Sequence, residues 1–149
     1  MLYPILSGIL LVAMTVVIHA VGTTGWIVLL VHRYGREGNL PPRTAIVVMT
    51  WTVVVLLLLH VSQCLLWALA YLLLEPVAEI TTFEEALYFS LVTFTTLGYG
   101  DITLPESRWR VVSGIQALNG IVLLGWSTAL LFTVVQRSWE RTGTVRGRH

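Results

Sequence analysis

The stretch that decides the fold reads Thr95-Thr96-Leu97-Gly98-Tyr99-Gly100-Asp101. Gly98 and Gly100 alternate with larger residues, and glycine adopts backbone φ angles that other residues rarely reach. A strand of this kind can point successive carbonyl oxygens to one side, where they can replace the water shell of a small cation. Because long apolar segments flank the stretch, we expect it at membrane depth. Non-helical backbone is tolerated there only where it lines a cavity or is buried in protein.

The composition of the chain is that of a membrane protein. It has 149 residues, of which 56% are hydrophobic and 11% are charged, and its net charge is +1. This charge balance gives no reason to expect a nucleic-acid partner. The single cysteine, Cys64, lies in an apolar run, so its expected role is packing.

Three apolar segments are long enough to cross a bilayer: residues 2–31, 44–74 and 109–136. At a rise of ~1.5 Å per residue, each helix would cover a hydrocarbon core of ~30 Å. Pro41 and Pro42 separate the first segment from the second, because proline ends a helix or prevents its continuation.

A fourth helix, over residues 81–94, is predicted to be too short to span the membrane. Thr82 and Glu85 fit a capping box, in which the two side chains satisfy the free N–H groups at the helix start. This helix runs directly into the glycine-rich stretch. A capped short helix followed at once by alternating glycines is a more specific pattern than either part alone.

The glycine-rich stretch resembles the selectivity filter of potassium channels, TVGYGD, over residues 96–101, with Leu97 in place of valine. The resemblance covers residues 47–136. It implies that the short helix is the pore helix and that the spans on either side are the outer and inner helices. The implied fold is an all-α membrane protein with a re-entrant pore loop. Four identical chains would surround the pore, because one strand cannot enclose an ion.

This resemblance divides the chain into three parts. Residues 44–139 are the pore module, residues 1–43 are an extra transmembrane helix with a cytoplasmic linker, and residues 140–149 are a short basic cytoplasmic tail. The extra helix has no ladder of arginines like that of a voltage sensor. We therefore expect it at the periphery of the pore.

The resemblance also implies which residues hold and support the permeant ion, K⁺. The filter residues are Thr96, Leu97, Gly98, Tyr99 and Gly100. The first four would present carbonyl oxygens, the Thr96 hydroxyl can add an inner ring, and Gly100 closes the strand. Thr95 and Asp101 flank the filter and support it. Tyr88 either bonds Asp101, as a tryptophan does in other family members, or is an aromatic residue of the membrane interface.

Five residues in the spans have two readings each. Gly120 matches the hinge glycine of the inner helix or serves close helix packing, and Gly125 competes for the hinge role. Asn119 faces the cavity or bonds another helix. His19 and His60 make gating proton-sensitive, or they are neutral and hydrogen-bonded between helices.

The arginines predict the orientation of the chain in the membrane. Arg-rich segments lie after the first span and after the last, and the positive-inside rule places both in the cytoplasm. The N-terminus is then outside, together with the acidic residues around the pore entrance, Glu75, Glu79, Glu84, Glu85, Asp101 and Glu106. The Arg-rich tail is an anchor or contacts anionic lipid headgroups. The resemblance to bacterial members implies a bacterial inner membrane.

The expected function is passive, K⁺-selective conduction by a homotetramer, with no cofactor and no enzymatic activity. Two alternatives remain: a weakly selective cation channel, and a non-conducting regulatory or scaffold subunit in the membrane. A secondary transporter is disfavoured, since the chain has too few helices and no internal repeat.

Overall fold

A computed structural model describes residues 2–35, 41–73, 80–104 and 107–141. Within these ranges the chain folds into α1 (Leu2–Tyr34), α2 (Pro42–Leu73), α3 (Phe83–Phe94) and α4 (Ser107–Arg141). Both α1 and α2, and the stretch Trp109–Glu140 of α4, are long and apolar enough to cross a membrane. The all-helical fold with three spans and one short helix is confirmed.

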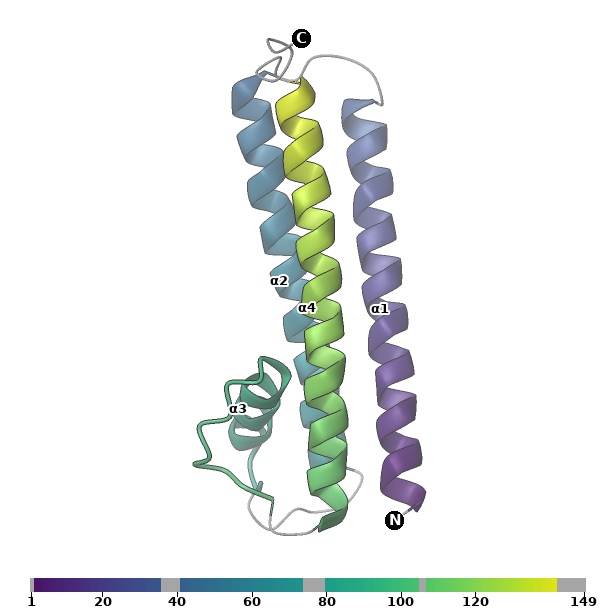
Figure 1. Cartoon of the computed structure of the whole chain (residues 1–149), viewed down its shortest axis with the longest axis vertical. Helices are drawn as coiled ribbons and strands as arrows, with labels where there is room; N and C mark the ends of the chain where they lie inside the picture. Colours follow the sequence, from purple (N-terminus) through teal and green to yellow (C-terminus); the bar gives the residue numbers. More distant parts are fainter. Residues whose placement is uncertain (1, 36–40, 74–79, 105–106, 142–149) are drawn as a thin grey trace.

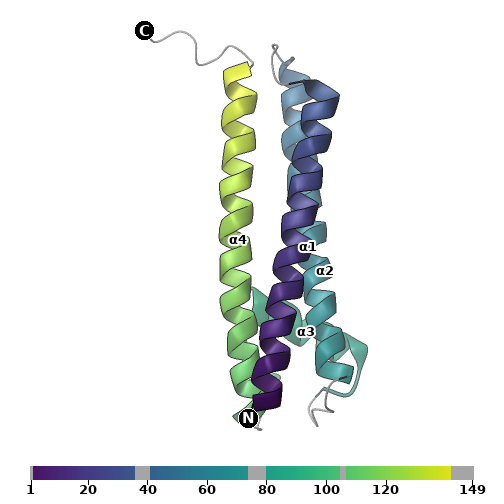
Figure 2. The same ribbon diagram turned by 90° about the vertical axis from the view of Figure 1, so that its right-hand side faces the viewer.

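The three long helices lie side by side, and α3 packs at one end of them (Figure 1). Helix α3 contacts α2 and α4, whereas α1 contacts α2 and α4 but not α3. Figure 2 shows α1 and α3 on opposite faces of the pair formed by α2 and α4. The extra helix therefore packs against its own chain, on the side away from the short helix.

Several helix boundaries differ from the expected spans, and α1, for example, continues past the expected end at residue 31 to Tyr34. Helix α2 begins at Pro42, ahead of the expected start at residue 44, because proline fits the first turn, where its missing N–H needs no partner. Helix α4 runs past the expected end at residue 136, and past the expected boundary after residue 139, to Arg141. Within this last turn Gln136 Nε2 donates to Glu140 Oε1 at 3.2 Å.

An aromatic core fixes α3 between α2 and α4. Tyr71 of α2 is fully buried, and its ring meets the edge of Phe89 of α3 with centroids 5.1 Å apart. The ring of Trp109 at the start of α4 lies 6.1 Å from the same tyrosine. Edge-to-face pairs of this kind add to the stabilisation that burial alone provides. The end of the bundle that carries α3 is thus built around Tyr71.

Buried polar side chains join the same three helices. Tyr71 Oη donates to Gln116 Oε1 at 2.7 Å, and Gln116 Nε2 donates to Ser90 Oγ at 2.7 Å. Ser90 Oγ in turn donates to the carbonyl of Cys64 at 2.8 Å. Interhelical hydrogen bonds of this type help to associate helices in lipid, where no water competes. They hold α3 at a fixed height along α2 and α4.

Most of the surface of the long helices is not covered within the chain. Only 22%, 28% and 22% of the most apolar windows of α1, α2 and α4 are buried. Such helices need lipid or further protein around them.

Candidate ion-binding loop

The short helix begins with the predicted capping box, which is confirmed. Glu85 N donates to Thr82 Oγ1 at 3.2 Å, and Glu85 Oε2 accepts from the backbone N–H of Thr82 at 2.9 Å. The same carboxylate accepts from the backbone N–H of Thr81 at 2.8 Å. These backbone donors, that of Thr81 first, hold the pKa of Glu85 below its usual range. A negative charge therefore sits at the positive end of α3.

The loop that follows α3 folds back on the last turn of this helix. Thr96 N donates to the carbonyl of Thr93 at 3.0 Å, and Leu97 N donates to the carbonyl of Val92 at 2.9 Å. The loop start is therefore held by carbonyl groups that the helix itself leaves unpaired. The direction in which the next residues leave α3 is set by this turn.

Positive φ angles recur at every second residue of the loop. They are 59° at Thr96, 56° at Gly98 and 82° at Gly100. A backbone that alternates between positive and negative φ angles can align successive carbonyl oxygens on one side, as a row of cation ligands requires. A Cβ built on Gly98 or Gly100 meets no atom within 4 Å, so within the chain it is the φ angle, and not lack of space, that favours glycine here.

Thr96 is the residue of this alternation that the sequence did not reveal. A β-branched residue at positive φ is a backbone outlier, and such strain costs on the order of 1–3 kcal/mol. Its φ continues the period of two that the glycines define. The sequence signal for a positive φ at Thr96 was its spacing, because Thr96 lies two positions before Gly98, as Gly98 lies two positions before Gly100. Strained backbone of this kind often lies at functional sites.

One side-chain bond ties the far end of the loop to the short helix. Tyr88 Oη donates to Asp101 Oδ2 at 2.6 Å. This bond lowers the pKa of the Asp101 carboxyl and raises the pKa of the Tyr88 hydroxyl. Thr95 Oγ1 donates to the Leu91 carbonyl at 2.7 Å, inside the last turn. The loop is thus fixed at both ends, at Thr95 and at Asp101.

No residue of the described chain covers the loop. Every residue from 95 to 101 is exposed, including the large side chains of Leu97 and Tyr99, which are 55% and 68% exposed. A single chain therefore offers carbonyl oxygens from one direction only. The side chains of Leu97 and Tyr99 are thus left uncovered by the described residues of this chain.

Gly120 permits a close contact between α4 and the end of α3. A Cβ on this residue would lie 2.0 Å from the carbonyl oxygen of Phe94, the last residue of α3. A Cβ on Gly125 meets no atom within 4 Å. Helix α4 continues unbroken through both glycines. In this structure Gly120 has the packing role, and the hinge role of Gly125 stays a prediction.

Asn119 is buried between α4 and α1. Its Nδ2 donates to Thr15 Oγ1 of α1 at 2.8 Å, and the residue is 5% exposed. Of the two roles that the sequence left open for Asn119, the bond to another helix is the one formed within the chain. The contact between α1 and α4, which the sequence could not place, covers this side chain.

His19 and His60 lie together between the three long helices. Their rings stack with centroids 5.3 Å apart. Gln63 bridges them, with Nε2 3.0 Å from His19 Nδ1 and Oε1 3.3 Å from His60 Nδ1. Ser127 Oγ lies 3.3 Å from His19 Nε2 and 2.9 Å from His60 Nε2. Each ring nitrogen thus has a polar partner, as a neutral, hydrogen-bonded pair between helices requires.

Several predicted residues lie outside the described ranges. They are Arg36 in the first linker, Glu75, Glu79 and Glu106 around the pore entrance, and the tail arginines Arg146 and Arg148.

Residues 44–137 match the model of a protein family described as "Ion channel". The chain is 40% identical over 48 residues to the two-pore potassium channel 4 of Arabidopsis thaliana, covering 32% of this chain and 17% of that protein. It is 36% identical over 72 residues to the calcium-gated potassium channel TvoK of Thermoplasma volcanium, covering 48% and 21%. It is 30% identical over 87 residues to the human voltage-gated potassium channel regulatory subunit KCNG1, covering 56% and 17%.

The chain spans about a fifth of the length of these curated relatives. No solved structure matches it significantly. The family match covers well over half of the chain and includes α2, α3, the loop and nearly all of α4. Together with three helices that can each cross a bilayer, it identifies a multi-pass integral membrane protein that belongs to the ion channel family, among the potassium-channel pore proteins.

Proposed function

We propose that this chain is the subunit of a homotetrameric channel that conducts K⁺ passively and selectively. The observation that carries the proposal is the alternation of positive φ at Thr96, Gly98 and Gly100, directly after a short capped helix. Carbonyl oxygens aligned by this alternation would replace the hydration shell of K⁺. The negative end of the α3 dipole, next to the loop, adds attraction for a cation. Conduction of this kind needs no cofactor.

Assembly of four chains is proposed because the loop is incomplete alone. Leu97 and Tyr99 are large and exposed, and four copies around an axis would cover them and supply carbonyls from all sides. Helix α1 packs on the face of the α2 and α4 pair opposite α3 (Figure 2). It would therefore lie outside the pore and leave the loop free to meet its copies.

The charges support an orientation with the loop outside. Arg33 and Arg43 flank the turn from α1 to α2, and Arg137 lies near the end of α4, at the end of the bundle opposite α3 (Figure 1). By the positive-inside rule this end is cytoplasmic. The N-terminus is then outside and the C-terminus inside, in a membrane that the resemblance suggests is the bacterial inner membrane.

The decisive experiment is ion flux into liposomes that contain the purified protein, under a K⁺ gradient and then a Na⁺ gradient. We expect flux that prefers K⁺ and that is lost in Gly98→Ala, since alanine resists the positive φ at this position. Gly114→Ala is the matched control, because a Cβ there meets no atom within 4 Å and the position lies in a helix. Equal K⁺ and Na⁺ flux would instead indicate the weakly selective cation channel.

A non-conducting regulatory subunit is the second candidate. One relative is named a regulatory subunit of voltage-gated potassium channels, and the extra helix α1 offers a surface for partners. The same liposomes separate the candidates. A verified homotetramer without flux, combined with K⁺ flux when another channel subunit is added, would favour the regulatory role.

A further inference from the structure

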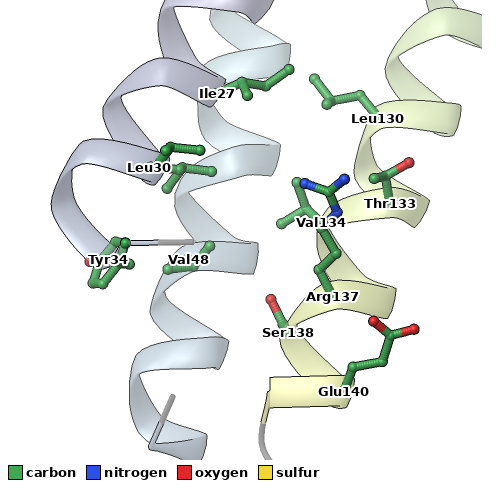
Figure 3. Close-up of a pocket in the computed structure, with 12 residues that line it drawn as sticks. Ile27, Leu30, Tyr34, Val48, Leu130, Thr133, Val134, Arg137, Ser138 and Glu140 are labelled. Atoms are coloured by element: carbon green, nitrogen blue, oxygen red, sulfur yellow. The ribbon is translucent and has the colours of Figure 1, made fainter. Parts of the chain in front are cut away.

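The structure contains a cavity of about 730 Å³ between α1, α2 and α4. Figure 3 shows the side chains that line it, from Ile27 to Tyr34 of α1 and from Leu130 to Glu140 of α4. These ends of α1 and α4 lie at the end of the bundle opposite α3 (Figure 1). Its volume lies within the range of ~300–1,000 Å³ that is usual for small-molecule sites.

Apolar side chains line much of this cavity, and the polar residues Arg137, Ser138 and Glu140 line it near the end of α4. Leu30 of α1, Val48 of α2, and Leu130 and Val134 of α4 line the inner part. Arg137 extends its guanidinium from α4 towards these side chains (Figure 3). A ligand that fits both parts has a long hydrocarbon portion and an anionic group at one end.

Arg137 lacks an ionic partner in the part of the chain that the structure describes. The carboxylate of Glu140 also lines the cavity, but it accepts from Gln136 Nε2 at 3.2 Å and points away from the guanidinium (Figure 3). A guanidinium next to apolar walls favours an anion that can hydrogen-bond to its planar fork. Phosphate oxygens fit this geometry in a bidentate manner.

We propose that this cavity binds an anionic glycerophospholipid from the cytoplasmic leaflet. One acyl chain lies between Leu30, Val48 and Leu130, and the phosphate bonds Arg137. This proposal rests on the proposed function for the orientation of the chain, because the cavity must open at the cytoplasmic surface. Basic pockets between helices on that side are known to attract such headgroups.

Two other occupants fit the charges less well. The C-terminal residues 142–149 contain Arg146 and Arg148 but no acidic residue, so they would bring positive charge to Arg137. A neighbouring copy packed through its α4 would bring one acidic residue, Glu140, and this carboxylate already accepts from Gln136. A lipid anion supplies the missing charge together with the apolar volume.

An occupied cavity would also influence the pore. Movement of the end of α4 towards α1 would close the cavity, so a bound lipid favours the present spacing of the two helices. A ligand shifts such an equilibrium only through its different affinity for the two arrangements. The fraction of anionic lipid in the membrane would therefore change K⁺ flux.

Native mass spectrometry of the purified tetramer tests the site without any need for conduction. The protein is titrated with phosphatidylglycerol or with phosphatidylcholine of the same acyl chains. We expect one tightly held phosphatidylglycerol per subunit and weaker retention of phosphatidylcholine. Leu130→Trp fills the cavity without a change of charge and should weaken binding about tenfold, because acyl-chain contact is lost. Ile46→Trp, on the exposed face of α2, is the matched control and should leave binding unchanged.

The charge is tested by a second pair of variants. Arg137→Gln should weaken binding more than tenfold, whereas Arg43→Gln, which removes a charge at the same membrane end but outside the cavity, should weaken it by about fivefold or less. Equal losses in the two variants would mean general surface attraction and would overturn the proposal. Equal binding of the two lipids would also overturn it. So would dissociation of the tetramer in Leu130→Trp, because the cavity would then be filled by a neighbouring copy of the chain. Loss of K⁺ flux with lipid binding intact would contradict the proposed function alone.

Discussion

Gly120 of α4 lies directly against the carbonyl oxygen of Phe94, so that a Cβ on residue 120 would come within 2.0 Å of this oxygen. Phe94 is the last residue of α3 and directly precedes the loop. The contact therefore fixes the distance between α4 and the start of the loop. Because this neighbouring atom belongs to the backbone, a larger residue cannot be accommodated by the rotation of a side chain.

Gly120→Ala should destabilise the subunit by about 1–3 kcal/mol, the usual cost of overpacking a tight contact. We expect a lower midpoint of thermal unfolding and a lower K⁺ flux, since α3 must move away from α4. Gly125→Ala is the control for stability, because a Cβ there meets no atom within 4 Å. Wild-type stability with lost gating in Gly120→Ala would show a hinge instead of a packing contact.

Tyr88→Phe should loosen the outer end of the loop. The phenol donates to Asp101 at 2.6 Å and joins α3 to the residue that follows the filter. We expect a several-fold lower ratio of K⁺ to Na⁺ permeability, with the tetramer intact. Asp101→Asn should have a similar effect, and the double variant should be no worse than either single one, because both remove one bond. Additive losses would show that the two residues act separately.

The same bond predicts how acid affects the loop. It holds the pKa of Asp101 below its usual range, which in unfolded chains is about 3.9. The stabilisation is therefore fully present above that value and is lost as pH falls through the lower pKa of the folded state. We expect the permeability ratio to stay constant down to about pH 4.5 and to decrease only below about pH 3.9. In Tyr88→Phe this bond is absent at every pH, so the ratio should already be low and should not decrease further in this range.

The helices and the loop were predictable from sequence because their signals are local. Long apolar runs define α1, α2 and α4, and Thr82 with Glu85 defines the start of α3. The glycines at 98 and 100 predicted alternating backbone angles, and these angles are observed. The positive φ of Thr96 was not predicted, because a β-branched residue disfavours this angle.

The contacts between helices could not be predicted, because they depend on how the helices rotate against one another. Asn119 has a polar side chain in an apolar helix, and sequence alone allowed a cavity or another helix as its neighbour. The rotation of α4 brings it to Thr15. In the same way, His19 and His60 come from different helices, and only the packing of α1 brings their rings together.

Asn119→Leu tests whether the inner helix exposes a polar group to the pore. Thr15 Oγ1 already donates to the carbonyl of Val12 at 2.8 Å, so loss of the asparagine leaves this hydroxyl with a partner. We expect a loss of about 0.6 kcal/mol, the mean for interhelical hydrogen bonds in membranes, and unchanged single-channel conductance. Thr15→Val should cost more, since it leaves the buried amide of Asn119 without its acceptor. A clear change in conductance in Asn119→Leu would restore the cavity reading.

The histidine pair should not make the flux proton-sensitive near neutral pH. The four ring nitrogens of His19 and His60 are already within hydrogen-bond distance of Gln63 or Ser127, and an added proton would place charge in the hydrocarbon region. We expect wild-type K⁺ flux to remain constant between about pH 7.5 and about pH 5.5. The measurement is liposome flux with equal pH on both sides.

A wild-type flux that changes steeply in this range would contradict that expectation, and two variants would then locate the sensor. Combined His19→Gln and His60→Gln removes both rings of the pair, whereas His32→Gln changes an exposed residue in the last turn of α1. Loss of the pH response in the double variant, with a normal response in His32→Gln, would assign it to the pair. The ring of His60 lies 5.5 Å from that of Phe94, so a charge there would act next to the end of α3. Protonation of His60 would then affect the loop through Phe94, the residue that also packs against Gly120.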